Sequence, residues 1–147
     1  MTATAHALIG GAIAAAISDP AIGLPLATLS HPIADMIPHW DFGLGWRKKT
    51  KFTLILEGSA DLLLGVVASY LIFGGKAETW YLFTAIFLAE VWDLMQVPYW
   101  ILNWKFPPFS TFYNFQHLIN SKATLPWGIL TQAATVGGLV LILRTIH

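Results

Sequence analysis

The sequence predicts an all-α protein, a polytopic membrane bundle of about five helices that forms one integral membrane domain over residues 1–147. Hydrophobic residues make up 56% of the chain and charged residues 11%, whereas globular domains carry about 25% charged residues. A chain of this length cannot hide so much apolar surface from water, so lipid is its natural solvent. The formal net charge is zero, and we therefore expect no nucleic-acid partner.

The first two apolar segments are expected to be short or kinked membrane helices. One runs from about Ala3 to Ser18 and stops at Asp19-Pro20, a strong helix breaker. It is short for a full span. The next runs from about Ala21 to Ile37 and contains Pro25 and Pro32, which predict a kink.

Three further segments complete the predicted bundle. The stretch from about Phe52 to Phe73 is a clear span, and the stretch from about Glu78 to Leu102 is long enough to be tilted. The last span is expected at about Leu125 to Leu143. Between them, Asn103 to Thr124 mixes aromatic and polar residues, a pattern typical of a segment lying in the membrane interface.

Basic residues predict the orientation in an inner (cell) membrane. Two large loops on one side hold six of them, whereas the other side holds two: Arg47, Lys48, Lys49, Lys51, Lys105 and Lys122 against Lys76 and Arg144. The positive-inside rule places the large loops in the cytoplasm and the carboxyl terminus outside. The expected surroundings are membrane lipids, while the oligomeric state cannot be read from the sequence.

Ionisable residues inside the apolar segments are the strongest functional signal, because such groups are costly in a bilayer and usually face a cavity or each other. At about 1.5 Å per residue, those found here fall in the cytoplasmic half of the membrane. Histidine nitrogens mixed with carboxylate oxygens suit Zn²⁺, with Mn²⁺ or Fe²⁺ as alternatives. The predicted metal ligands are His6, His31, Asp35, His39, Asp61 and Asp93.

Two glutamates add candidate acid–base groups near these ligands. A divalent metal lowers the pKa of water toward neutrality and so makes a nucleophile for hydrolysis. Glu57 and Glu90 are the candidates for general base, or for a group that accepts a hydrogen bond from a metal ligand.

Two motifs in the first 41 residues resemble a known family. They are T-A-H-A-L-I-G-G (Thr4 to Gly11) and S-H-P-I-A-D-M-I-P-H-W-D (Ser30 to Asp41). The chain resembles the small inner-membrane metal-dependent hydrolases, which are loosely related to zinc-dependent phospholipase C. This resemblance implies that His6, His31 and Asp35 are metal ligands in a helical membrane hydrolase.

The chain departs from that family elsewhere. The Pro-Asp-x-Asp segment and the His-Arg-x-x-x-His pair are absent. Pro38 to Asp41, Asp61 and Asp93 would have to supply the missing ligands.

The sequence favours one function over two rivals. We expect a membrane-embedded metal-dependent hydrolase with a cytoplasm-facing site, acting on a phospholipid or another amphipathic phosphoester. The rivals are a proton- or metal-ion-coupled transporter or ion-binding protein, and a non-catalytic membrane scaffold. A transporter is disfavoured because the polar residues occupy one half of the membrane and no inverted repeat is visible.

Overall fold

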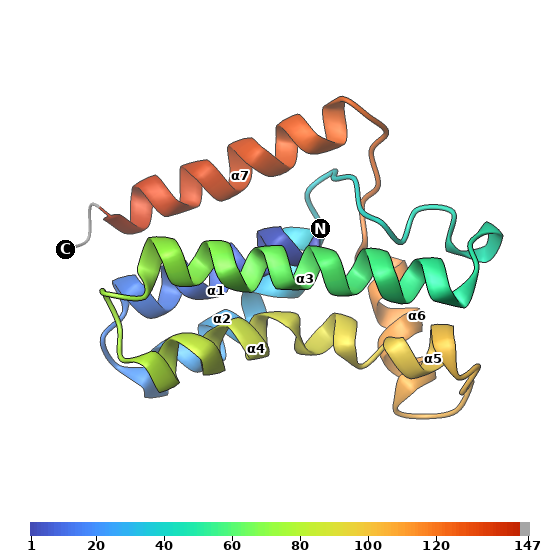
Figure 1. Ribbon diagram of the computed structural model, residues 1–147, viewed down its shortest axis with the longest axis horizontal. Coiled ribbons are helices and arrows are strands. Elements are labelled where there is room, and N and C mark those ends of the chain that lie inside the picture. The colour runs from blue at the N-terminus through green and yellow to red at the C-terminus, as the bar shows by residue number, and fades with distance from the viewer. Residues whose placement is uncertain (145–147) are drawn as a thin grey trace.

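The computed structural model describes residues 1–144 and is all-helical over that range, which confirms the all-α prediction. Figure 1 shows α1, α3, α4 and α7 running roughly along one long axis, with α5 and α6 gathered at one end. The elements are α1 (Ala3–Ala16), α2 (Pro20–Asp35), the 3₁₀ helix η1 (Trp46–Lys48), α3 (Lys51–Phe73), α4 (Thr79–Leu94), α5 (Val97–Ile101), α6 (Phe109–Ile119) and α7 (Trp127–Arg144).

Helix α1 is the centre of the bundle and contacts α2, α3, α4 and α7. Its small residues permit this close packing. A Cβ added at Gly10 would lie 2.8 Å from the Ala85 carbonyl oxygen of α4. On the α3 side, a Cβ added at Gly65 would lie 2.7 Å from Thr4 Cα. The backbone of α1 therefore packs directly against the backbones of α3 and α4.

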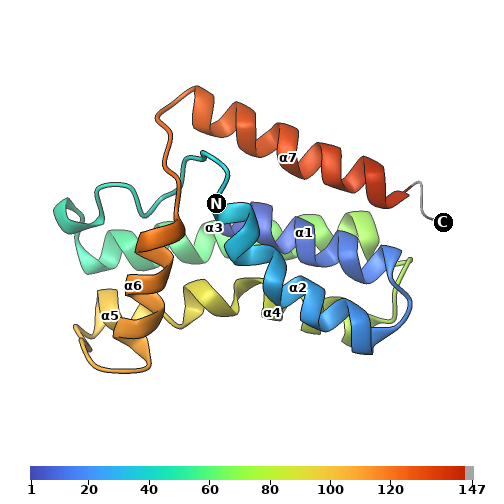
Figure 2. The ribbon, with the colours of Figure 1, turned by 180° about the vertical axis from the view of Figure 1, so that it is seen from behind.

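The predicted helix over 78–102 is wrong in its length, because it is divided in two. Helix α4 ends at Leu94 and α5 begins at Val97. Pro98 lies at the start of α5. It lacks an N–H, and in a continuous helix its ring would clash with the carbonyl four residues earlier, that of Leu94. The break turns the chain at the end of the bundle where α6 also lies (Figure 2).

The segment expected in the membrane interface contains α6, which packs against α2 and α5. Backbone hydrogen bonds fix the chain that follows it: Ser121 N–H donates to the Asp35 carbonyl at 2.9 Å, and His39 N–H donates to the Ser121 carbonyl at 3.1 Å. These bonds hold the end of α2, the loop after it and the end of α6 together.

The bundle buries several ionisable side chains and exposes many large apolar ones. The described interior contains His6, His31, Asp35 and Glu90, each at most 2% exposed. The outer faces of α2, α3 and α7 carry large exposed apolar side chains, including Ile33, Phe52, Leu63, Leu71, Trp127 and Leu141.

One helix in residues 1–144, α3, is long and apolar enough to cross a membrane by length and composition, with 23 residues and a mean hydropathy of 1.6 over an 18-residue stretch. Helices α1 and α7 are apolar but shorter. The five-span arrangement and its orientation stay predictions.

The packing of α3 on α1 predicts opposite effects for two glycine substitutions. Gly65→Ala should lower the free energy of unfolding by about 1–3 kcal/mol, because the added methyl group overpacks the α1–α3 contact. Gly137→Ala, on α7 with open space around it, should raise it by up to about 1 kcal/mol through helix propensity. Thermal unfolding in detergent, followed by circular dichroism, measures both. Equal melting temperatures for the two variants would contradict the close approach.

Candidate metal centre

Asp35, the last residue of α2, lies at the centre of a cluster of imidazole rings. Its Oδ1 lies 3.2 Å from His6 Nε2 of α1 and 3.6 Å from His39 Nε2 in the loop after α2. Its Oδ2 lies 3.4 Å from Nε2 of His31, one helical turn earlier. Asp35 is 1% exposed and the three histidine side chains are fully buried. Three segments of chain thus direct three imidazole nitrogens at one carboxylate.

Backbone carbonyls decide which nitrogen of two rings carries the proton. His31 Nδ1 lies 2.5 Å from the Ala89 carbonyl oxygen, and His39 Nδ1 lies 2.7 Å from the Ile37 carbonyl oxygen. A carbonyl oxygen only accepts, so both Nδ1 atoms donate. In the neutral rings Nε2 then presents a lone pair toward Asp35. Protein metal sites commonly orient their histidine ligands in this way.

Two more carboxylates face the same nitrogens. Asp93 Oδ1 of α4 lies 3.5 Å from His31 Nε2, and Asp41 Oδ2 lies 3.5 Å from His39 Nε2. Ligand atoms of His6, His31 and Asp93 all lie within 4.8 Å of one another, so these three residues could hold a metal ion. The structure leaves the identity of that metal open.

Polar atoms without partners show that the cluster fits a cation. Within residues 1–144, His39 Nε2 and His6 Nδ1 are buried and have no hydrogen-bond partner. The His6 and His31 rings stack with centroids 3.6 Å apart, an arrangement that disfavours a charge on both. The ammonium group of Met1 contacts Asp35 Oδ1. It supplies one positive charge against the carboxylates of Asp35, Asp41 and Asp93, so a further cation would be favoured here.

Gln116 of α6 is a member of the cluster that the sequence did not indicate. Its Nε2 lies 2.9 Å from His31 Nε2, 3.3 Å from Asp35 Oδ2 and 3.5 Å from Asp93 Oδ1. Its Oε1 is buried and has no hydrogen-bond partner. The side chain carries no charge, and α6 was expected in the interface, so neither depth nor ionisation pointed to it.

Asp61 forms no ion pair with the histidines among the described residues. Its carboxylate instead binds the start of α1. Its Oδ2 accepts from the Ala3 N–H at 2.6 Å, and its Oδ1 accepts from Thr4 N–H at 3.2 Å and from Thr4 Oγ1 at 2.7 Å. The carboxylate thus caps the first turn of α1, where backbone N–H groups lack partners and the helix dipole favours an anion. The spacing of Glu57 and Asp61 could not reveal this contact.

The two predicted catalytic glutamates lie in different settings. Glu57 is 30% exposed and its Oε2 accepts from Lys49 Nζ at 2.5 Å. Glu90 is 2% exposed, and its Oε1 has no hydrogen-bond partner among the described residues. Glu90 therefore has a carboxylate oxygen free to take a proton, whereas Glu57 is engaged in an ion pair.

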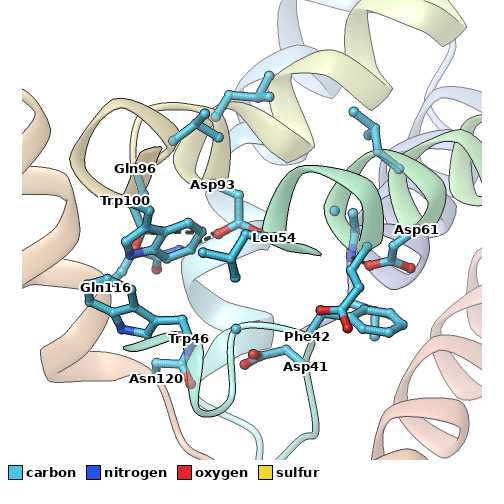
Figure 3. Close-up of a pocket in the computed structure, with 18 of the residues that line it drawn as sticks. Asp41, Phe42, Trp46, Leu54, Asp61, Asp93, Gln96, Trp100, Gln116 and Asn120 are labelled. Carbon is cyan, nitrogen blue, oxygen red and sulfur yellow. Dashed lines mark hydrogen bonds between the residues drawn. The ribbon is translucent and has the colours of Figure 1, made fainter. Parts of the chain in front are cut away.

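A cavity of about 650 Å³ opens beside the cluster. Asp35, Asp93, Gln116 and both glutamates line it. Figure 3 shows Asp93 on one side of the cavity with Trp46 and Trp100 nearby, and Asp61 on the other side. Small-molecule sites in proteins are typically about 300–1,000 Å³, so the cavity could admit a substrate to the cluster.

No protein-family model matches the chain, and no similar protein was found among curated sequences or among solved structures. The resemblance to inner-membrane hydrolases therefore remains a prediction from the two motifs at Thr4–Gly11 and Ser30–Asp41.

The capping contacts of Asp61 predict that this residue supports folding and not metal binding. Asp61→Ala should lower the free energy of unfolding by about 2 kcal/mol, since charge-assisted hydrogen bonds to two backbone N–H groups are lost. Its metal content should equal that of the unsubstituted protein. Thermal unfolding and elemental analysis of the same sample check both parts. Loss of metal without loss of stability would return Asp61 to the ligand set.

Proposed function

We propose that the protein is a membrane-embedded metal-dependent hydrolase whose site faces the cytoplasm and acts on a phospholipid or another amphipathic phosphoester. One observation carries the proposal. Three imidazole Nε2 atoms point at the Asp35 carboxylate. In two of these rings, those of His31 and His39, Nδ1 donates a hydrogen bond to a backbone carbonyl. Lone pairs facing a carboxylate repel it, and a cation between them removes the repulsion.

The proposed ligands are His6, His31, His39, Asp35 and Asp93, shared by one metal ion or by two. The donor set of imidazole nitrogen and carboxylate oxygen supports Zn²⁺, with Mn²⁺ or Fe²⁺ as alternatives. A divalent cation there would supply the acidified water that serves as nucleophile. Glu90, with its unpartnered Oε1, would accept the proton from that water.

Membrane residence is supported by the buried ionisable side chains and by the large apolar side chains exposed on the outside of the bundle. Besides α3, we propose that α1, α2, α4 and α7 cross the bilayer. They have 14, 16, 16 and 18 residues, respectively. A typical membrane-spanning helix has about 20 residues. Local thinning of the bilayer accommodates such short helices. Six of the eight basic residues lie in residues 47–51 and 103–124, and three of these line the cavity, which favours the cytoplasmic side for that end.

Metal content tests the proposal at its first step. The purified protein should hold at least one equivalent of Zn, Mn or Fe, and His31→Ala and Asp35→Ala should each lose most of it, because each removes a central ligand. His117→Ala is the matched control: His117 is exposed and stacks on Tyr113, with ring centroids 5.9 Å apart. Elemental analysis after exhaustive dialysis measures all four proteins.

Absence of metal from the unsubstituted protein, with unchanged stability in both cluster variants, would refute the hydrolase. Metal binding with ion flux into liposomes and no hydrolysis would favour the transporter.

The unequal settings of the two glutamates predict unequal catalytic effects. Glu90→Gln should reduce hydrolysis of a phospholipid substrate by about 10²–10⁴-fold, as expected for loss of a general base, and should keep the metal. Glu57→Gln should keep most of the activity, because Lys49 already neutralises that carboxylate. Turnover assays on the two metal-loaded variants and the unsubstituted protein measure these effects. A larger loss in Glu57→Gln would assign the base to Glu57 instead.

A further inference from the structure

Two walls of the cavity beside the cluster are apolar, and both reach the outer surface of the bundle. The wall from α3 contains Leu54 and Ile55, and the wall from α4 and α5 contains Leu94 and Val97. Ile55 is 49% exposed, Leu94 37% and Val97 42%. Apolar residues of α3 and of α4–α5 thus both line the cavity and are exposed.

The same cavity also carries basic side chains. Arg47, Lys48 and Lys122 line it, together with the carboxylates of Asp35, Asp41, Glu57, Asp61, Glu90 and Asp93. The Arg47 guanidinium donates to Tyr113 Oη at 3.4 Å and lies 5.1 Å from the centre of a Trp46 ring. Lys49, by contrast, is paired with Glu57. Arg47 is therefore a cation held in place on the cavity wall, with no carboxylate among its described partners.

Exposed apolar walls and the cation of Arg47 in one cavity match the two ends of an anionic lipid. An acyl chain could pass between α3 and α4–α5 without leaving apolar surroundings. Its phosphate would meet a guanidinium, whose planar fork suits phosphate oxygens. Neither feature is needed for a small, fully water-soluble substrate, which would enter from the polar loops.

We propose that this cavity binds a lipid with an anionic phosphate headgroup. The lipid enters sideways from the bilayer between α3 and α4–α5, and Arg47 holds its phosphate within reach of the metal cluster. The inference rests on the proposed function for its membrane setting, and it names the substrate class and the route of entry.

Lipid binding to the full-length Glu90→Gln protein as purified, which should keep its metal but lose hydrolysis, tests this inference separately from turnover. Native mass spectrometry from detergent micelles would compare didodecanoyl phosphatidic acid with phosphatidylcholine of the same chains. We expect at least about tenfold tighter binding of phosphatidic acid, equivalent to one strong charge-assisted contact. Arg47→Gln should remove this preference.

Bulky substitutions at the opening test the route. Val97→Trp and Ile55→Trp, from opposite walls, should each weaken phosphatidic acid binding by about tenfold or more, since an indole fills the gap an acyl chain needs. Leu63→Trp is the matched control, because Leu63 lies on α3, is 65% exposed and does not line the cavity. Circular dichroism melting identifies any variant that fails to fold.

Three results would overturn the inference. They are equal binding of the two lipids, unchanged binding in both opening variants, and equally tight binding of water-soluble glycerol phosphate. Tight, selective lipid binding in a protein that holds no metal would refute the hydrolase and leave the lipid site standing. Metal binding with no selective lipid binding would refute the lipid site and leave the metal-dependent hydrolase standing.

Discussion

The arrangement of the bundle depends on the meeting of three imidazole Nε2 atoms with the carboxylate of Asp35. His6 comes from α1, His31 and Asp35 from α2, and His39 from the loop that follows. The carbonyl groups of Ala89 and Ile37 set two of the rings, so α4 and the loop backbone also define the geometry. Acceptor groups gathered in a buried place are unfavourable unless a positive charge joins them. The fold therefore gathers residues that could hold a cation.

This cluster requires α1 to lie at the centre of the bundle. His6 reaches Asp35 because α1 is enclosed by four helices, and glycines at the contacts allow the backbones to approach. Asp61 holds the start of α1 through its first N–H groups. With the polar side chains turned inward, the outer faces of α2, α3 and α7 are left apolar. The same packing thus places the cluster and makes the surface suited to lipid.

The sequence predicted the helical class and gathered His6, His31, Asp35, His39 and Asp93, because four-residue spacing and depth in a span are local properties. It missed what depends on contacts distant in the chain. Asp61 stands four residues from Glu57 on an apolar helix, and nothing in that pattern shows that it meets Ala3. Gln116 is uncharged, so a search for ionisable groups passes over it. Pro98 indicates the break after Leu94, but the long apolar stretch around it favoured the prediction of one continuous helix.

X-ray absorption at the edge of the bound metal tests whether the cluster around Asp35 is a metal centre. The metal in the purified protein should have a first shell of nitrogen and oxygen at about 2.0–2.2 Å. Outer-shell scattering should show at least two imidazoles and should weaken in His39→Ala. A shell of oxygen alone, or a spectrum unchanged by that substitution, would mean that the metal binds elsewhere and that the cluster around Asp35 is not a metal centre.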